Sequence, residues 1–275
     1  MLSRILATAA LEFAIARRNR WVLVSVAMMM LFALILSLAG SAPAGAMAAD
    51  PLSVTVASLI SLAVYLVPLI ALLISFDAIA GEAERGTLAL ALTYPLARTE
   101  LLAGKLAAQL LVVSIAVAAG YGVAALVAFA GGGIAATEGL PALWRLVWSS
   151  ILLGAVFLSL GHAMSCLSTR PAGAAAMAIG LWLVAVVLYD LGLLAAIVAD
   201  DGGRFTTDIL PWALVLNPAD AFRIFNLAAS EAVDVASGLS GAASSIAWWK
   251  PLGAILAWPV AAALLARLFF QKVTP

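Results

Sequence analysis

Charged residues, cysteine and histidine are scarce in this sequence. Only 10% of its 275 residues are charged, whereas 65% are hydrophobic, and the mean hydropathy is +1.16. Because soluble domains are about half apolar and about a quarter charged, this composition indicates a polytopic membrane protein. The single cysteine, Cys166, excludes an internal disulfide and a cysteine-rich metal or iron–sulfur site. The formal net charge of zero argues against nucleic-acid binding, which requires a basic face.

Motifs for nucleotide hydrolysis and for common hydrolytic chemistry are also missing. The Gly104-Lys105 pair is followed by Leu and lacks the upstream glycine of a phosphate-binding loop. No HExxH, CxxC or GxSxG pattern occurs, so we do not expect an enzyme. His162 and Cys166 share a helix face at i, i+4, and soft ligands of this type suit copper or zinc. Two ligands do not make a site, however, and we predict no metal site in this chain.

Six apolar segments have the roughly twenty residues that a helix needs to cross a bilayer. They are residues 21–38, 54–75, 106–130, 144–167, 172–198 and 252–270. Pro68 predicts a kink in the second of them. The first run is too long for a cleaved signal peptide, so we expect it to remain as a span.

Residues 1–20 predict an amphipathic helix on the membrane surface, with Ser3 as its N-cap. A frayed basic tail is the alternative. The apolar stripe of the helix consists of Leu2, Ile5, Leu6, Ala9 and Phe13.

Cationic residues predict the orientation of these spans. An even number of spans places both termini on one side, and ten of the 14 lysines and arginines fall there. This bias predicts cytoplasmic termini and a cytoplasmic loop at residues 76–105. The other side receives Arg145, Arg204, Arg223 and Lys250, together with most acidic residues: Asp50, Glu138, Asp200, Asp201, Asp208, Asp220, Glu231 and Asp234.

The loop at residues 76–105 is the most charged internal segment, and a short apolar motif, Thr87 to Thr93, lies at its centre. Its Ala and Leu residues favour a helix, although the alternation of Leu and Ala also fits a strand. Thr87 could cap a two-turn helix that ends at Pro95. Such a helix is typical of a segment that docks in a groove of a partner. A re-entrant or bundle-capping turn is the alternative.

Two further features are candidate sites. Asp190 falls inside the fifth span, where a carboxylate is costly and needs a function or a partner, and Arg145 is at a suitable depth to be that partner. A purely structural pair is the alternative. The outer segment, residues 199–251, predicts short helices on the outer surface, with Asn217 as an N-cap before Pro218. These helices either dock a partner or cap the bundle; the candidate docking residues are Trp212, Asn217, Asp220, Phe222, Arg223 and Phe225.

Residues Gly81 to Lys105 carry the pattern GExExGTLxLxLTYPLxRxxLLxGK. This pattern resembles the ABC-2 class of transporter permeases. Within that class, the chain is most similar to the membrane subunits of the ABC transporters that help to mature nitrous oxide reductase. The similarity extends over nearly the whole chain through Phe76-Asp77-Ala78-Ile79, Tyr189-Asp190-Leu191, Leu210-Pro211-Trp212 and Leu216-Asn217-Pro218-Ala219-Asp220.

The resemblance implies an all-α, ABC-2 (type V exporter-like) permease fold, with residues 1–275 in a single transmembrane permease domain. It implies a homodimer in the bacterial inner membrane, two copies of a cytoplasmic ABC ATPase (NosF-like) and a periplasmic NosD-like protein. ATP and Mg would be bound by the ATPase, and this chain would hold no cofactor. The complex would support assembly of the copper–sulfur site. Thr87–Tyr94 would be the coupling helix, and the residues that couple to the ATPase would be Glu82, Glu84, Arg85, Gly86, Thr87, Leu88, Leu90, Leu92, Tyr94, Pro95 and Arg98.

Other functions stay open at this point. The chain could be an ABC-2 exporter of another small molecule, or a membrane scaffold that holds a periplasmic maturation factor. An ion-coupled secondary carrier is a further alternative, but it would need more buried ionisable residues than Asp190 and His162. Co-purification of an ATPase distinguishes a transporter permease from such a carrier.

Overall fold

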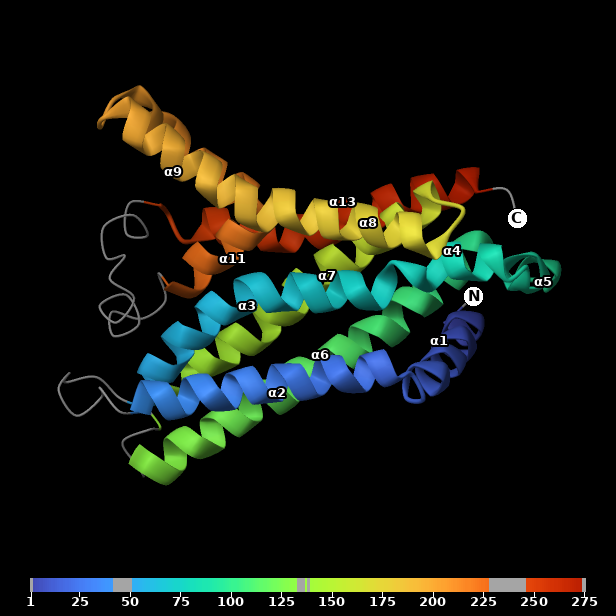
Figure 1. Cartoon of the computed structure of the whole chain (residues 1–275), viewed down its shortest axis with the longest axis horizontal. Helices are drawn as coiled ribbons and strands as arrows, with labels where there is room; N and C mark the ends of the chain where they lie inside the picture. Colours follow the sequence, from blue (N-terminus) through green and yellow to red (C-terminus); the bar gives the residue numbers. More distant parts are fainter. Residues whose placement is uncertain (1, 42–50, 133–136, 138, 228–245, 274–275) are drawn as a thin grey trace.

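The chain folds into a bundle of long helices, which we describe from a computed structural model (Figure 1). The structure describes residues 2–41, 51–132, 137, 139–227 and 246–273. Within these ranges it contains no strand. The helices are α1 (Leu2–Ala16), α2 (Arg20–Ser41), α3 (Pro51–Ser75), α4 (Asp77–Glu84), α5 (Thr87–Thr93), α6 (Arg98–Gly132), α7 (Leu140–Leu167), α8 (Pro171–Trp182), η3 (Leu183–Leu188), α9 (Tyr189–Asp200), η4 (Phe205–Ile209), α10 (Leu210–Leu216), α11 (Pro218–Leu227) and α13 (Trp249–Lys272).

Five helical segments of the described chain are long and apolar enough to cross a membrane. They are Leu52–Glu84, Arg98–Ala130, Leu140–Leu167, Pro171–Asp200 and Trp249–Lys272, and each contains one predicted span. The predicted span at residues 21–38 lies in α2, whose apolar part, Val22–Leu38, is shorter than the other five. The all-helical, multi-span prediction is therefore confirmed, and most spans continue as helix beyond the predicted apolar limits.

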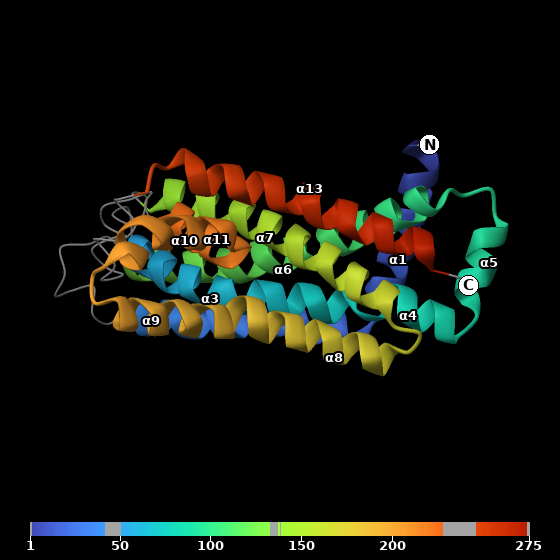
Figure 2. The same cartoon turned by 90° about the horizontal axis from the view of Figure 1, so that it is seen from above.

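The long helices run roughly side by side, with α3 and α7 at the centre (Figures 1 and 2). α2 lies along α6, and α13 lies along α7. Small residues permit close approach of α6 to α2 and of α7 to α6. A Cβ atom on Gly120 of α6 would lie 2.8 Å from Cγ of Met29 in α2, and one on Gly154 of α7 would lie 2.7 Å from Cγ1 of Val113 in α6. Such contacts are typical of helices that pack within a membrane.

α1 packs across the beginning of α6 rather than standing apart from the bundle. A Cβ atom on Gly104 would lie 2.6 Å from Cβ of Thr8, which is the buried residue of α1. Within the predicted apolar stripe, Ile5 is half-buried whereas Leu2 and Leu6 are exposed; that the stripe faces the membrane surface stays a prediction. Ser3 is not an N-cap, since it lies inside the first turn of the helix.

The predicted span at residues 172–198 contains a π-helical segment, η3, between α8 and α9. A wider turn leaves backbone groups without regular helical partners. The carbonyl of Ala185 in η3 instead accepts a hydrogen bond from Nδ2 of Asn217 (2.7 Å). This irregularity was not predictable from the sequence, because the residue that satisfies the carbonyl is distant in sequence.

Of the two alternatives predicted for the outer helices, α11 fits capping of the bundle rather than exposure at the outer surface. Asn217 does cap this helix, since its Oδ1 accepts a hydrogen bond from the amide of Ala219 (2.8 Å). α11 packs against α3, α7 and α13 inside the bundle, and Phe222 and Phe225 are 0% and 8% exposed. Both faces of the helix are covered, because its polar residues also find partners there. Four of the acidic residues predicted to lie on the outer side are not among the residues that the structure describes: Asp50, Glu138, Glu231 and Asp234.

Candidate functional site at the coupling loop

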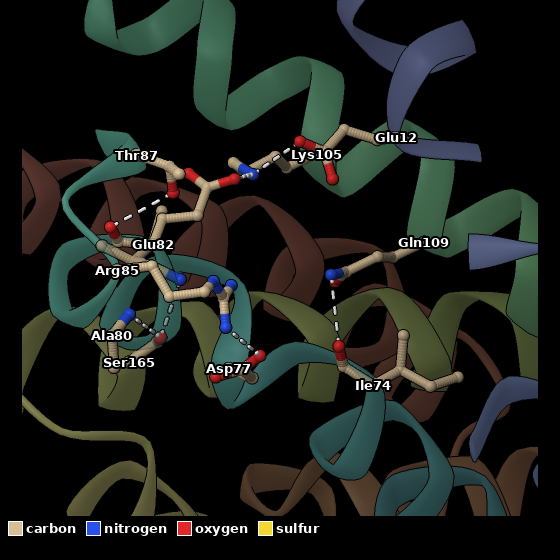
Figure 3. A network of polar contacts seen from close by, with 11 residues as sticks. Glu12, Ile74, Asp77, Ala80, Glu82, Arg85, Thr87, Lys105, Gln109 and Ser165 are labelled. Atoms are coloured by element: carbon tan, nitrogen blue, oxygen red, sulfur yellow. Dashed lines mark hydrogen bonds and ion pairs between the residues drawn. The ribbon is translucent and has the colours of Figure 1, made fainter. Parts of the chain in front are cut away.

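The predicted coupling loop lies at the end of the bundle that also holds α1 and the end of α13 (Figure 1). It begins with α4, which follows α3 after Phe76. The hydroxyl of Ser165 in α7 accepts hydrogen bonds from the amides of Ile79 (3.0 Å) and Ala80 (2.9 Å) (Figure 3). The first amides of a helix have no partner within the helix itself. Ser165 thus fixes the start of α4 to the core of the bundle.

A left-handed glycine turns the chain from α4 into α5. Gly86 has φ +68°, a conformation that residues with a Cβ atom rarely adopt. The turn is closed by hydrogen bonds from the amide of Arg85 to the carbonyl of Gly81 and from the amide of Gly86 to that of Ala83. Thr87 does not cap α5 as predicted, because Gly86 occupies the cap position; the Thr87 hydroxyl donates to the carbonyl of Glu82 instead (3.3 Å).

The helix predicted between Thr87 and Pro95 is present as α5, and it has two unlike sides. Leu88 is fully buried in a small apolar cluster that includes Ile79 and Phe270. Leu92 is half-buried beside this cluster. Leu90 and Tyr94 point the other way and are 64% and 67% exposed. The structure therefore divides the predicted coupling residues into an anchor side and an exposed apolar side. The helix ends at Tyr94, which is extended before Pro95 as expected.

A buried lysine joins the loop to two other helices (Figure 3). The side chain of Lys105 in α6 is 2% exposed, and its Nζ lies 2.6 Å from Oε1 of Glu12 in α1 and 2.6 Å from Oε1 of Glu82 in α4. We call Lys105, Glu12 and Glu82 the lysine cluster. Glu82, predicted to flank the coupling helix, thus points inward, whereas Glu84 is exposed. Arg85 lies at the surface, 3.6 Å from a carboxylate oxygen of Asp77.

The far end of the loop is fixed to α13. Nη1 of Arg98 donates hydrogen bonds to the carbonyls of Phe270 (2.9 Å) and Val273 (2.6 Å), and its guanidinium lies 5.9 Å from the centre of the Phe270 ring. Cations favour the C-terminal ends of helices, where carbonyls lack partners. Glu100 completes this region, because its Oε2 accepts from the amide of Ala97 (2.9 Å) at the start of α6.

Glu12 and Ser165 were not predicted as parts of this site, and Lys105 was placed in the charged loop but not among the coupling residues. Lys105 carried a usable signal, since it is a lone cation among apolar residues well inside a helix that continues as a membrane span. The partners of Lys105 could not be found in this way. Glu12 and Glu82 lie on different helices, and only the tertiary fold brings them together.

The second candidate site has a different partner from the predicted one. Oδ2 of Asp190 lies 2.7 Å from Nη2 of Arg223 in α11, not against Arg145, and Nη1 of Arg223 lies 3.0 Å from Oδ1 of Asp220. The guanidinium of Arg145 stands 5.4 Å from the centre of the Phe225 ring. Asp190 and Arg145 were paired because they lie at a similar depth in the membrane. Their helices, however, do not turn the two side chains toward each other. α11 brings Arg223 to Asp190.

Asp220 belongs to this buried ion cluster and is 1% exposed. Burial, together with the negative charge of Asp190, raises the pKa of Asp220 to about 7, although Arg223 acts in the opposite direction. Asp220, Arg223, Phe222, Phe225 and Asn217 were predicted to dock a periplasmic partner, but they lie in the interior or at its edge. Trp212 is the exposed member of that predicted set, at 59%.

His162 and Cys166 do not form part of a larger ligand set. His162 is fully buried, and its Nδ1 lies 2.8 Å from the carbonyl of Leu158 in the preceding turn. Among the described residues, no group of three or more His, Cys, Asp or Glu side chains is placed to hold a metal ion. At the loop of residues 76–105 the structure thus presents an exposed apolar helix whose flanking segments are hydrogen-bonded and ion-paired to the bundle.

Comparison with known proteins identifies the family. A family model described as ABC-2 family transporter protein matches residues 6–274. The chain is 43% identical over 271 residues to the probable ABC transporter permease protein NosY of Pseudomonas aeruginosa, which covers 95% of each chain. It is 38% identical over 262 residues to the probable ABC transporter permease protein NosY of Stutzerimonas stutzeri, which covers 93% of each chain. The chain belongs to the ABC-2 family of transporter proteins and is a multi-pass membrane permease.

Proposed function

We propose that this permease works with a separate ABC ATPase and that α5 is the helix through which the ATPase moves it. The observation that carries this proposal is the division of α5 into two sides. Leu88 anchors the helix, while Leu90 and Tyr94 are held outward at 64% and 67% exposure. Apolar side chains presented on a short helix are typical of docking into a groove of a partner.

The connections around α5 support a role in transmitting movement. α4 is fixed to α7 through Ser165 and to α1 and α6 through Lys105. Arg98 fixes the other end of the loop to α13. A displacement of α5 would therefore move several long helices together, because packed elements shift as rigid bodies rather than deform continuously.

The distribution of cationic residues supports placing α5 and both termini in the cytoplasm. In this orientation the chain is a homodimer in the bacterial inner membrane that binds two copies of a NosF-like ATPase. A NosD-like protein binds on the periplasmic side. ATP and Mg are bound by the ATPase, and the permease itself carries no cofactor and no catalytic residue.

The process we propose is maturation of the copper–sulfur site of nitrous oxide reductase. The similarity to two permeases named NosY, over nearly their whole length, supports this assignment. The permease then converts ATP hydrolysis by its partner into transport or into conformational work on the periplasmic protein.

Co-expression with the ATPase tests the role of α5. We expect Leu90→Asp to reduce the co-purifying ATPase and its vanadate-sensitive activity by about tenfold or more, since a charge cannot enter an apolar groove without a partner. Leu90→Met is the matched control and should retain both. Because Leu90 is exposed, neither variant should change the thermal unfolding midpoint of the permease.

Full binding and stimulation of the ATPase by Leu90→Asp would refute the role of α5. Another outcome would favour the ion-coupled carrier, for which the specific observation is the pair of carboxylates Asp190, which is 26% exposed, and Asp220, which is buried. Vesicles that contain the permease alone would then show transport driven by an ion gradient without ATP.

A further inference from the structure

A cavity lies at the end of the bundle opposite the coupling loop. It has a volume of about 620 Å³ and lies between the beginning of α7, the beginning of α13 and the buried helix α11. Its lining includes Trp144, Arg145, Trp148, Phe225, Trp248 and Leu252. We call this cavity the Arg145 pocket. It is separate from the coupling loop and from the Asp190–Arg223–Asp220 ion cluster.

Arg145 supplies the positive charge of the pocket. Its guanidinium stands over the Phe225 ring, and Trp148 packs edge-on against the same ring with centroids 5.2 Å apart. No carboxylate among the described residues forms an ion pair with Arg145, whereas Arg223 at the same end is held by two of them. The pocket therefore combines a guanidinium that no carboxylate of the described residues neutralises with a wall of aromatic rings.

The side chains at the mouth of the pocket face outward. Trp144 and Trp248 are 69% and 67% exposed. Indole rings prefer the boundary between the hydrocarbon and the headgroups of a membrane, and the pocket lies where two membrane spans begin. Its position therefore matches the level at which lipid phosphates lie.

Few lysines and arginines lie at this end of the molecule, so the placement of Arg145 in an aromatic pocket calls for a functional explanation. Only four of the 14 lysines and arginines belong to this end. Of these, Arg223 is used by the ion cluster, and Lys250 packs on Trp212 with its Nζ 4.3 Å from the ring centre. A guanidinium can bind phosphate through two parallel hydrogen bonds, which suits Arg145 to that group.

We propose that the Arg145 pocket binds the phosphate group of an anionic phospholipid from the surrounding membrane. The guanidinium contacts the phosphate, and the tryptophans pack against the glycerol and the first part of the acyl chains. A free phosphate ion would use the guanidinium but leave the aromatic wall unoccupied. A zwitterionic lipid would place its amine beside a positive charge, so an anionic headgroup is preferred.

Lipid titration of the full chain in detergent tests this site. Native mass spectrometry would measure the binding of phosphatidylglycerol and of phosphatidylcholine to the delipidated protein. We expect Arg145→Gln to weaken binding of phosphatidylglycerol by about tenfold, the effect of losing a charge-assisted hydrogen bond. Arg204→Gln is the matched control, because Arg204 is an exposed cation on the same side that does not line the pocket.

Several results would overturn the proposal. Equal binding of phosphatidylglycerol by Arg145→Gln and the unsubstituted protein is one, and equal binding of the two lipids is another. Displacement of the lipid by millimolar inorganic phosphate would show a site for a free anion instead. If Arg145→Gln fails to fold, Trp248→Ala serves as the second variant, since that side chain is exposed; it should also bind phosphatidylglycerol more weakly, and unchanged binding would count against the site.

Discussion

The lysine cluster offers the most direct test of how the coupling loop is connected to the bundle. Lys105→Met removes the ammonium group but keeps a long apolar side chain of similar length. The carboxylates of Glu12 and Glu82, which both lie 2.6 Å from Nζ of Lys105, would then face each other without a cation. The perturbation leaves two like charges close together, in a place that water reaches only in part.

The loss of stability expected for Lys105→Met follows from how deeply the three charged side chains are buried. Lys105 is 2% exposed, and the glutamate side chains are 20% and 21% exposed. Removing one partner from a buried ion pair costs about 3–5 kcal/mol. Because both glutamates keep some contact with solvent, we expect about 2–3 kcal/mol here. In a chain of this size each kcal/mol lowers the unfolding midpoint by about 2–4 °C, so the midpoint should fall by about 4–12 °C.

Thermal unfolding of the purified permease in detergent measures this shift. The triple variant Lys105→Met, Glu12→Gln, Glu82→Gln should recover most of the lost stability, because no buried charge is then left without a partner. Glu84→Gln is the matched control for the loss of a carboxylate. Glu84 is exposed on the same helix as Glu82, so its replacement should change stability by less than about 0.5 kcal/mol.

Two results would refute this reasoning. Lys105→Met could unfold at the same temperature as the unsubstituted protein, which would mean that the ion pairs contribute nothing net. Alternatively, the triple variant could be as unstable as Lys105→Met, which would mean that Lys105 acts through packing alone.

Two further predictions concern the turn before α5 and the buried ion cluster. Gly86→Ala should lower the free energy of unfolding by about 1 kcal/mol, because φ is +68° there; Gly122→Ala, in helical backbone with open space around it, should cost nothing in the same thermal assay. The raised pKa of Asp220, about 7, means that the folded state retains a proton that the unfolded state releases near its ordinary pKa of about 3.9. This contribution to stability is complete below about pH 4 and is lost as the pH rises from about 4 to about 7, so the unfolding midpoint should fall over that range, and by less in Asp220→Asn. If the unfolding midpoint falls equally steeply with pH in Asp220→Asn and in the unsubstituted protein, the pH dependence arises from other groups.

The positions of the long helices could be predicted from sequence, because a membrane span needs only length and apolar composition. The start of α11 was also predictable, since Asn217 and Pro218 form a local signal that depends on no distant residue. The depth of α11 in the bundle was not. Its sequence shows one aromatic face and an i, i+3 pair of Asp220 and Arg223, but nothing in the pattern reveals that Asp220 would be buried.

The same limit applies to the coupling loop. Apolar composition and Pro95 were sufficient to predict a short helix, but the alternation of Leu88, Leu90 and Leu92 did not show which leucine faces outward. The direction depends on the turn at Gly86 and on the cluster that receives Leu88. The partners of a charged residue are equally difficult to predict from sequence when they lie on other helices, as the pairing of Asp190 with Arg223 shows.

The helical segment from α8 to α9 connects the two ends of the molecule in a way that bears on the proposed function. At one end α8 contacts α4, and at the other Asp190 of α9 is paired with Arg223 of α11. Most of its side chains are not buried, but hydrogen bonds from Trp182 to the carbonyl of Tyr65 and from Asn217 to that of Ala185 hold the segment to the bundle along its length. This segment is therefore held to the bundle at its ends and in its middle, and η3, where the helix is irregular, is where we expect it to bend. We therefore expect movement of α5 to reach α11 through this segment, and the buried ion cluster to be the point at which the far end of the bundle responds.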